Sequence, residues 1–152
     1  CDKVAVMNNG NIHQIDKPSK LINNPKTLFV TSFILGNNIL KIKYDNGKII
    51  SIFGAIELKN KLDNAEIKYL SISPKSISIK KSAKGVATVL SREYLGEYYI
   101  YKVLIKNTTV RVRSEISNNI YVGEKCNLNL IKGKEFFLFP LGLKSLIWII
   151  KN

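Results

Sequence analysis

The fold is decided by a strand-like run, Tyr98-Tyr99-Ile100-Tyr101-Lys102-Val103-Leu104-Ile105. The turn Asn107-Thr108 joins it to a second strand-like run, Val110-Arg111-Val112-Arg113. The first run is rich in the aromatic and β-branched residues that favour strands. In the second run valines alternate with arginines, so one face is expected to be buried and the other to meet water. The stretch therefore predicts an antiparallel β-hairpin.

Shorter runs with the same two-residue period lie on both sides of this hairpin, separated by Gly, Asn and Pro. Short strands at such regular spacing are typical of a small barrel or sandwich. The other strands are expected at residues 39–44, 48–53, 69–73, 76–79, 85–90, 120–122, 126–131 and 136–139. A terminal helix is expected over residues 143–150.

The first 35 residues have a different pattern. Residues 4–7 and 11–15 flank Asn8-Asn9-Gly10, a turn that predicts a β-hairpin. Pro18 is placed to open a short helix, and Pro25 to follow its end. Apolar residues at 29, 30, 33 and 34 then have helical spacing and predict a second helix. Gly36-Asn37-Asn38 marks the change from helix-type to strand-type pattern.

The chain of 152 residues has a net charge of +13, and residues 1–35 contribute only four basic and two acidic side chains to it. A field of this size suggests an anionic partner such as nucleic acid, a membrane surface or an anionic ligand. The alternative is compositional drift, because the basic residues are nearly all Lys, with Arg only at 92, 111 and 113. Arg would be expected to lead in a dedicated nucleic-acid reader.

Catalytic patterns are missing from the sequence. Neither Gly-Lys pair, at 47–48 or 133–134, completes the G-x-x-x-x-G-K-[ST] loop that cradles nucleotide phosphates. The single histidine, His13, is expected on a strand surface, and Cys1 and Cys126 are too isolated to form a metal cluster. Glu93 and Glu97 are expected to be solvated. We therefore expect neither ATP hydrolysis nor a metal site in this chain.

Two segments, taken in order, resemble a known family. Residues 1–10, followed by Phe29-Val30-x-x-Phe33-Ile34, resemble the end of the nucleotide-binding domain of ABC importer ATPases. Gly85-Val86, then Arg92-Glu93-Tyr94-Leu95-Gly96, resemble the corner of the transport-associated OB-type (TOBE) domain that follows it. Residues 123–128 and 137–139 resemble the strands that close that domain. At Ile72-Ser73-Pro74-Lys75 the chain departs from the family, which has Arg before the proline and Glu after it.

The resemblance covers residues 1–139 and is closest to importers of ferric iron, polyamines and related small solutes. It implies a mainly β fold, with a small OB-type barrel of short antiparallel strands preceded by a β-hairpin and two short helices. Residues 1–35 would be the tail of the ATP-binding domain, residues 36–140 the OB-type regulatory domain, and residues 141–152 a C-terminal tail. The interaction or dimer surface that we expect comprises Arg92, Tyr94, Leu95, Gly96 and Tyr98.

The resemblance also implies what this part would do. It would be a non-catalytic regulatory and dimerisation region without a cofactor of its own, since ATP and Mg would be held by the N-terminal domain that this sequence lacks. Its partners would be a second copy and, through the parent ATPase, the permease subunits, with no nucleic acid. Its location would be cytoplasmic, peripheral on the inner face of the cell membrane.

A second reading is a free-standing OB-type nucleic-acid binder, with a basic groove and with Tyr98, Tyr99 or Tyr101 as stacking platforms. Steep salt dependence of oligonucleotide binding would distinguish it. In the first reading the hairpin at 4–15 would normally continue the sheet of the ATP-binding domain. Without that neighbour it has unpaired edges, so we also expect an oligomer joined through the hairpin, the barrel or both.

Overall fold

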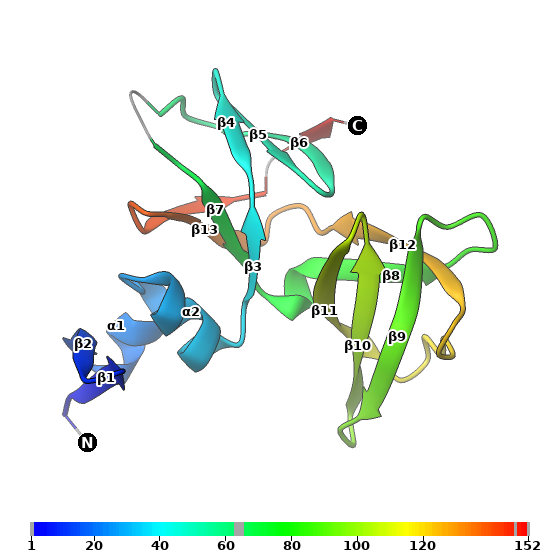
Figure 1. The fold of residues 1–152 in the computed structure, drawn as a ribbon, viewed down its shortest axis with the longest axis horizontal. Helices are drawn as coiled ribbons and strands as arrows, with labels where there is room; N and C mark the ends of the chain where they lie inside the picture. The colour runs from blue at the N-terminus through cyan, green and yellow to red at the C-terminus, as the bar shows by residue number, and fades with distance from the viewer. Residues whose placement is uncertain (1, 63–65, 148, 152) are drawn as a thin grey trace.

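The computed structural model describes residues 2–62, 66–147 and 149–151, and it begins with the expected hairpin (Figure 1). Strands β1 (Val4–Asn8) and β2 (Asn11–Asp16) pair antiparallel. The turn residues Asn9 and Gly10 both have positive φ, 50° and 77°, which Asn and Gly tolerate best. The Asn-Gly signal therefore identified this turn correctly.

Two short helices follow, as expected: α1 (Pro18–Asn23) and α2 (Leu28–Leu35). The Thr27 hydroxyl caps α2 by accepting a hydrogen bond from the Val30 N–H at 3.2 Å, and Gly36 ends it in the left-handed conformation. A small separate core of Val6, Leu21 and Val30 holds the hairpin and helices together.

The buried Gln14 side chain joins the hairpin to the segment between the helices. Its amide nitrogen donates to Asp16 and to the Asn24 carbonyl, and its oxygen accepts from the Lys26 N–H at 2.9 Å. Because its amide is hydrogen-bonded to these partners, the Gln14 side chain is buried at little cost in free energy, and it fixes the hairpin against the helices.

Two four-stranded antiparallel sheets make up the central and upper parts of the molecule in Figure 1. The first has the order β14-β13-β7-β3, with β3 at Asn38–Lys41, β7 at Tyr69–Ile72, β13 at Glu135–Phe139 and β14 at Leu143–Leu146. The second has the order β15-β6-β5-β4, with β4 at Lys43–Asp45, β5 at Lys48–Ser51, β6 at Gly54–Glu57 and β15 at Ile149–Lys151.

A five-stranded antiparallel sheet forms the right-hand part of Figure 1, in the order β11-β10-β9-β12-β8. A single 3₁₀ turn, η1 (Pro74–Ser76), leads into it. Its strands are β8 (Ile77–Lys81), β9 (Ala87–Tyr94), β10 (Tyr98–Ile105), β11 (Thr108–Glu115) and β12 (Lys125–Leu130). The sheet curls so that its edge strands β11 and β8 contact each other, although no ladder is recorded between them in the described residues. The expectation of a mainly β fold of short antiparallel strands is confirmed.

One continuous core runs through all three larger sheets, from Leu40 to Ile147. Ile49 and Ile56 contribute from the small sheet, Leu70 and Phe136 from the central sheet, and Tyr101 from the curled sheet. Burial of this apolar surface, at about 25 cal/mol per Å², is the main force that holds the sheets together.

The buried Asn38 side chain adds a polar tie between two of these sheets. Its amide donates to the Arg111 carbonyl at 2.9 Å and accepts from the Arg111 N–H at 2.8 Å. The side chain thus satisfies the outer backbone groups of edge strand β11 as a neighbouring strand would.

Two sequence expectations are wrong. The helix expected at 143–150 is replaced by strands β14 and β15, while residue 148 lies outside the described residues. Strand β14 pairs with the preceding strand β13, and β15 pairs with β6 far back along the chain. Residues 120–122 form no strand. There the Ile120 N–H donates to the Tyr101 hydroxyl and the Tyr121 N–H to the Glu124 carboxylate, so side chains replace a strand partner.

Candidate interaction surface

A β-bulge decides which side chains of β9 face inward. Ser91 pairs with Lys102 and Val89 with Val103, so Leu90 is an extra residue on β9. Beyond the bulge, Arg92 pairs with Tyr101 and Tyr94 with Tyr99, and directly paired residues lie on the same face. The bulge therefore places Arg92 and Tyr94 beside the tyrosines of β10 at the open end of the curled sheet.

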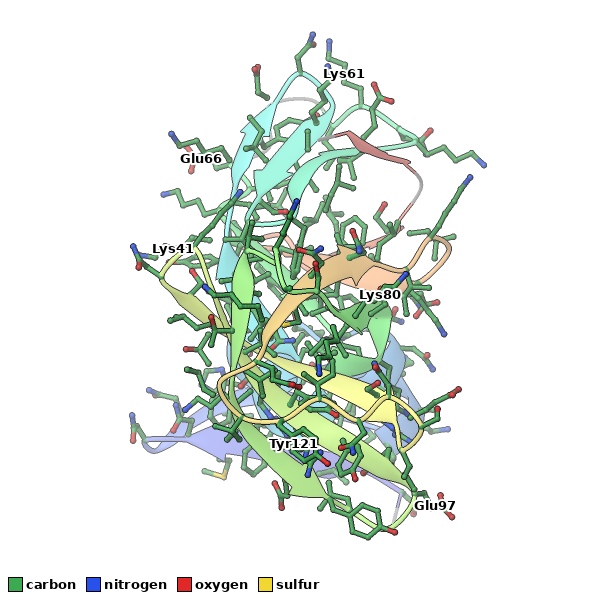
Figure 2. All side chains as sticks on the ribbon, turned by 90° about the vertical axis from the view of Figure 1, so that its right-hand side faces the viewer. Lys41, Lys61, Glu66, Lys80, Glu97 and Tyr121 are labelled. Atoms are coloured by element: carbon green, nitrogen blue, oxygen red, sulfur yellow. The ribbon has the colours of Figure 1, made fainter. Side chains whose placement is uncertain are left out.

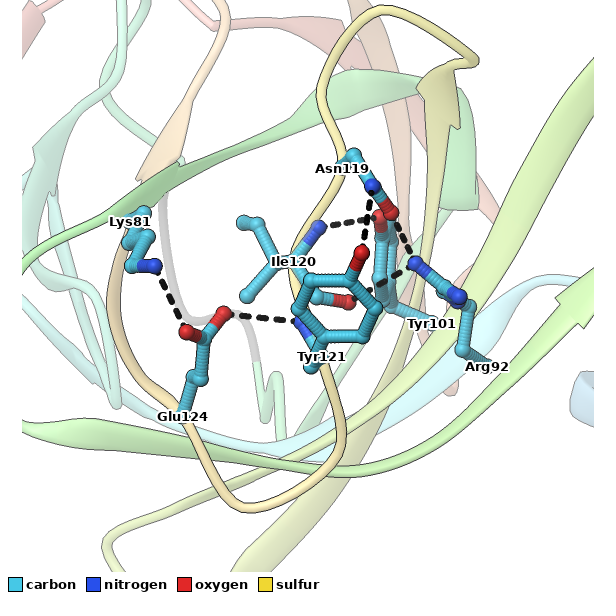
Figure 3. A network of polar contacts seen from close by, with 7 residues as sticks. All are labelled: Lys81, Arg92, Tyr101, Asn119, Ile120, Tyr121 and Glu124. Atoms are coloured by element: carbon cyan, nitrogen blue, oxygen red, sulfur yellow. Dashed lines mark hydrogen bonds and ion pairs between the residues drawn. The ribbon is translucent and has the colours of Figure 1, made fainter.

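Arg92 is held between two aromatic rings. Its guanidinium carbon lies 4.7 Å from the centre of the Tyr99 ring and 4.9 Å from that of Tyr121. Its Nη1 also donates to the Asn119 side chain and to the Ile120 carbonyl, as Figure 3 shows. Cation–π contacts with the two rings and the two hydrogen bonds fix this side chain in place.

Glu124 anchors the loop that carries Tyr121. One carboxylate oxygen accepts from the Lys81 ammonium at 2.6 Å and the other from the Tyr121 N–H at 2.8 Å (Figure 3). These two hydrogen bonds, the Lys81 bond foremost, hold the pKa of Glu124 below its usual range. The loop is therefore tied to β8 while Glu124 is ionised.

Tyr101 supports the same loop from below. Its ring is fully buried, and its hydroxyl donates to the Asn118 carbonyl at 2.6 Å and accepts from the Ile120 N–H at 3.1 Å. Sequence reasoning missed the contributions of Asn119, Tyr121 and Glu124, because they come from an irregular loop that lies far from β9 in the sequence.

The turn between β9 and β10 is the most exposed part of this end. Gly96 adopts a φ of 89°, and the Tyr94 hydroxyl donates to its carbonyl at 2.7 Å. Tyr94 is 60% exposed, Leu95 44%, Tyr121 56% and Val122 62%. We call these four side chains the Tyr94 patch. In Figure 2 the labelled Tyr121 and Glu97 lie toward the same end of the molecule, opposite Lys61.

Tyr98, the fifth residue expected at the surface, lies elsewhere. It precedes Tyr99 on β10, so its side chain points to the opposite face of the strand. The Arg113 guanidinium covers it at 3.6 Å from the ring centre. The structure thus groups Arg92, Tyr94, Leu95 and Gly96 at one end of the sheet and places Tyr98 on its outer face.

The other reactive side chains considered in the sequence, those of His13 and Cys126, pack against neighbouring residues of the fold. His13 is half-buried rather than at the strand surface as expected, because its ring packs against Phe29 at 4.8 Å and contacts the Thr27 hydroxyl at 3.1 Å. Cys126 is buried, and burial raises the pKa of its thiol. In the part of the chain that the structure describes, no cluster of His, Cys, Asp or Glu is placed to hold a metal ion.

The tyrosines offered as stacking platforms are largely occupied. Tyr101 belongs to the core, Tyr99 lies against Arg92, and Tyr98 lies beneath Arg113. A nucleic-acid base would need an open face of a tyrosine ring on which to stack, and these contacts leave less of each ring face open. The structure thus adds no support to the nucleic-acid reading.

The chain is similar to curated importer subunits. It is 28% identical over 140 residues to the spermidine/putrescine import ATP-binding protein PotA of Clostridium acetobutylicum, covering 86% of this chain and 38% of that protein. It is 32% identical over 133 residues to the protein of the same name from Borreliella afzelii, and that match covers 85% of this chain and 38% of that protein. With that of Bacillus thuringiensis it shares 45% identity over 58 residues, 34% of this chain and 18% of the relative. No family model matches the chain.

The class indicated by these matches is that of ABC importer ATPase subunits, and the expected resemblance to the C-terminal part of such subunits is confirmed. The curated relatives just described carry the name spermidine/putrescine import ATP-binding protein. The chain spans less than two fifths of the length of each of them. Among the described residues, no helix is both long and apolar enough to cross a bilayer.

Proposed function

We propose that this chain is the non-catalytic C-terminal regulatory and dimerisation region of the ATP-binding subunit of an ABC importer. The observation that carries the proposal is the similarity to import ATP-binding proteins over about 85% of the chain. The names of those relatives support a polyamine as the transported molecule, within the expected group of ferric iron, polyamines and related small solutes. The partners would be a second copy and the permease subunits, and the location the cytoplasmic face of the membrane.

The non-catalytic role is supported by the chemistry of the residues. The sequence lacks a phosphate-cradling loop, and its one histidine packs between Phe29 and Thr27. The groups that converge at the end of the curled sheet, Arg92 and Glu124, are engaged in holding loop residues 119–124. Polar side chains used in this way build a surface rather than a reaction centre.

The dimerisation role is supported by the Tyr94 patch. It places two tyrosines, a leucine and a valine on a scaffold fixed by the Arg92 stack and the Glu124 anchor. Exposed aromatic and aliphatic side chains on a rigid support are typical of protein–protein contacts. The patch is the part of this chain that we assign to contact with the second copy.

Light scattering over a range of protein concentrations tests the proposal, with and without the ATP-binding portion of the same importer subunit supplied as a separate chain. We expect a dimer that also captures the added portion, and no ATP turnover by the 152-residue chain alone. A monomer at high concentration that ignores the added portion would contradict the proposal, as would ATP turnover without it.

A further inference from the structure

A hollow beside the outer face of β11 is lined by basic side chains and by no carboxylate. It has a volume of about 160 Å³ and lies between the C-terminal end of α2, the turn η1 and strands β10 and β11. Its charged lining residues are Lys75, Arg111 and Arg113, and Ser73 also lines it. We call this hollow the Lys75 groove.

The two arginines share the groove because of strand geometry. They alternate on β11 with the buried Val110 and Val112, so both side chains stand on the outer face. The 3₁₀ turn at Pro74–Ser76 packs against β11 and brings Lys75 to the same place. Water reaches the exposed Lys75 and Arg111, and an anion bound among the three like charges would reduce their mutual repulsion further.

Among the described residues, no ion pair to Lys75, Arg111 or Arg113 is recorded. The pairs Lys81–Glu124 and Lys144–Glu135 lie away from the groove. Glu97 and Glu115 line the next hollow along the surface, which Lys75 and Arg113 also line, while no carboxylate lines the groove itself. An anionic ligand in the groove would therefore lie best beside Arg111, which does not line that neighbouring hollow.

The choice of side chains points to the kind of anion. The chain has only three arginines among 24 basic residues, and two of them lie in this groove. A guanidinium binds the oxygens of phosphate in a two-pronged manner that an ammonium cannot reproduce. The Arg113 guanidinium is already fixed over the Tyr98 ring at 3.6 Å, so little freedom is lost on binding.

The Ser73 hydroxyl completes the donor set. Its oxygen accepts from the Lys75 N–H at 3.2 Å, and no acceptor for its own proton is recorded in the described part of the chain. Gly36, the left-handed cap of α2, closes the opposite side, where Arg111 Nη1 lies 3.9 Å from the position that a Cβ on Gly36 would take. A bound anion would therefore contact both the end of α2 and the curled sheet.

We propose that the Lys75 groove binds a phosphate group, either as inorganic phosphate or as the end of a small phosphomonoester, held by Arg111, Arg113, Lys75 and Ser73. This site needs no part of the proposed transport function. The groove is too small for a larger ligand to be enclosed, so the remainder of a monoester would extend into the neighbouring hollow beside Leu35 and Asn37.

Isothermal titration calorimetry on the 152-residue chain tests the site, with inorganic phosphate and glycerol 3-phosphate as probes and chloride adjusted to constant ionic strength. We expect saturable binding that Arg111→Gln weakens about tenfold, since a charge-assisted hydrogen bond is lost. Arg111→Lys should weaken it less, because the charge remains while the fork is lost. Lys80→Gln, which removes one exposed charge from β8, should change the affinity less than twofold.

The outcomes separate the alternatives. Tighter binding of glycerol 3-phosphate assigns the groove to a phosphomonoester, and tighter binding of inorganic phosphate assigns it to the free ion. The proposal is overturned if neither probe saturates. It is also overturned if Arg111→Gln lowers the melting temperature but leaves the affinity for both probes unchanged, since the arginine would then be structural only.

Discussion

Gly85 packs directly against the backbone of Cys126: a Cβ on Gly85 would lie 2.3 Å from the Cys126 carbonyl oxygen and 2.7 Å from its nitrogen. Contacts that short with backbone atoms cannot be relieved by turning a side chain. Because β12 pairs with both β8 and β9 at this point, the loop can approach only with a glycine here.

Gly85→Ala is therefore expected to destabilise the fold by about 1–3 kcal/mol, the usual cost of overpacking. Urea unfolding followed by circular dichroism measures the change. Lys84→Ala, at the exposed neighbouring position, should stay within about 0.5 kcal/mol of the parent chain. Equal stability of the two variants would show that the loop moves away from Cys126 without cost.

Tyr101→Phe should cost about 1–3 kcal/mol, because the Ile120 N–H and the Asn118 carbonyl would lose the hydroxyl that they share. Tyr121→Phe is the matched control, since Tyr121 is exposed and, among the described residues, the hydrogen bond recorded for its hydroxyl comes from the Asn119 side chain. Urea midpoints give both values. A Tyr101→Phe variant as stable as the control would mean that water replaces the hydroxyl.

Asn38→Ala removes the side chain that pairs with both backbone groups of Arg111. We expect a loss of roughly 2–4 kcal/mol, because two hydrogen bonds at a buried position disappear together. Since Arg111 also lines the Lys75 groove, phosphate binding should weaken in parallel. Asn60→Ala, at a largely exposed loop position, should leave both stability and binding unchanged.

Glu124 gives the chain a definite pH dependence. Its pKa is lowered in the folded state, so its contribution to stability is present above the unfolded pKa of about 4.3 and is lost as the pH falls through the folded value. Glu124→Gln should flatten this acid limb of the stability curve, as measured by urea midpoints from pH 7 to pH 3. Glu97→Gln, in the exposed turn, should keep the slope of the parent chain.

The Tyr94 patch can be tested by placing a charge in it. Leu95→Asp should shift the proposed dimer toward monomer by tenfold or more in dissociation constant, because a carboxylate would have to be desolvated in the contact. Leu141→Asp, at another exposed loop position, is the control. If both variants dimerise like the parent chain in light scattering, the contact lies elsewhere, for example on the β1–β2 hairpin.

Local sequence patterns predicted the elements whose partners are close in the chain. The β1–β2 hairpin, helix α2 with its boundary at Gly36, and the β10–β11 hairpin all follow from local spacing and turn residues. Strand β15 was taken for a helix because its partner β6 lies far away in the sequence. Strands β6 and β14 were not predicted although each pairs with the strand directly before it, because both are only four residues long. Apolar residues such as those at 143–150 fit either period until the neighbouring strand is known.

The residues of the candidate surface, like the elements of the fold, could be predicted only where they lie close together in the sequence. Arg92, Tyr94, Leu95 and Gly96 belong to one strand and its turn, so a local motif could find them. Tyr98, which we expected at the same surface, lies on the opposite face from Tyr99 because neighbouring side chains alternate along β10. Tyr121 and Glu124 are placed by contacts with Arg92 and Lys81, which no local pattern records.

The pairing of β15 with β6 has a consequence for synthesis. Residues 54–57 leave the ribosome long before residues 149–151, so the small sheet must wait with one edge open while the curled sheet is made. Such distant pairing slows folding and leaves a strand edge that other chains can occupy. A premature stop just before β15 would leave that vulnerability permanent, even though every residue of the Tyr94 patch and the Lys75 groove would already be present.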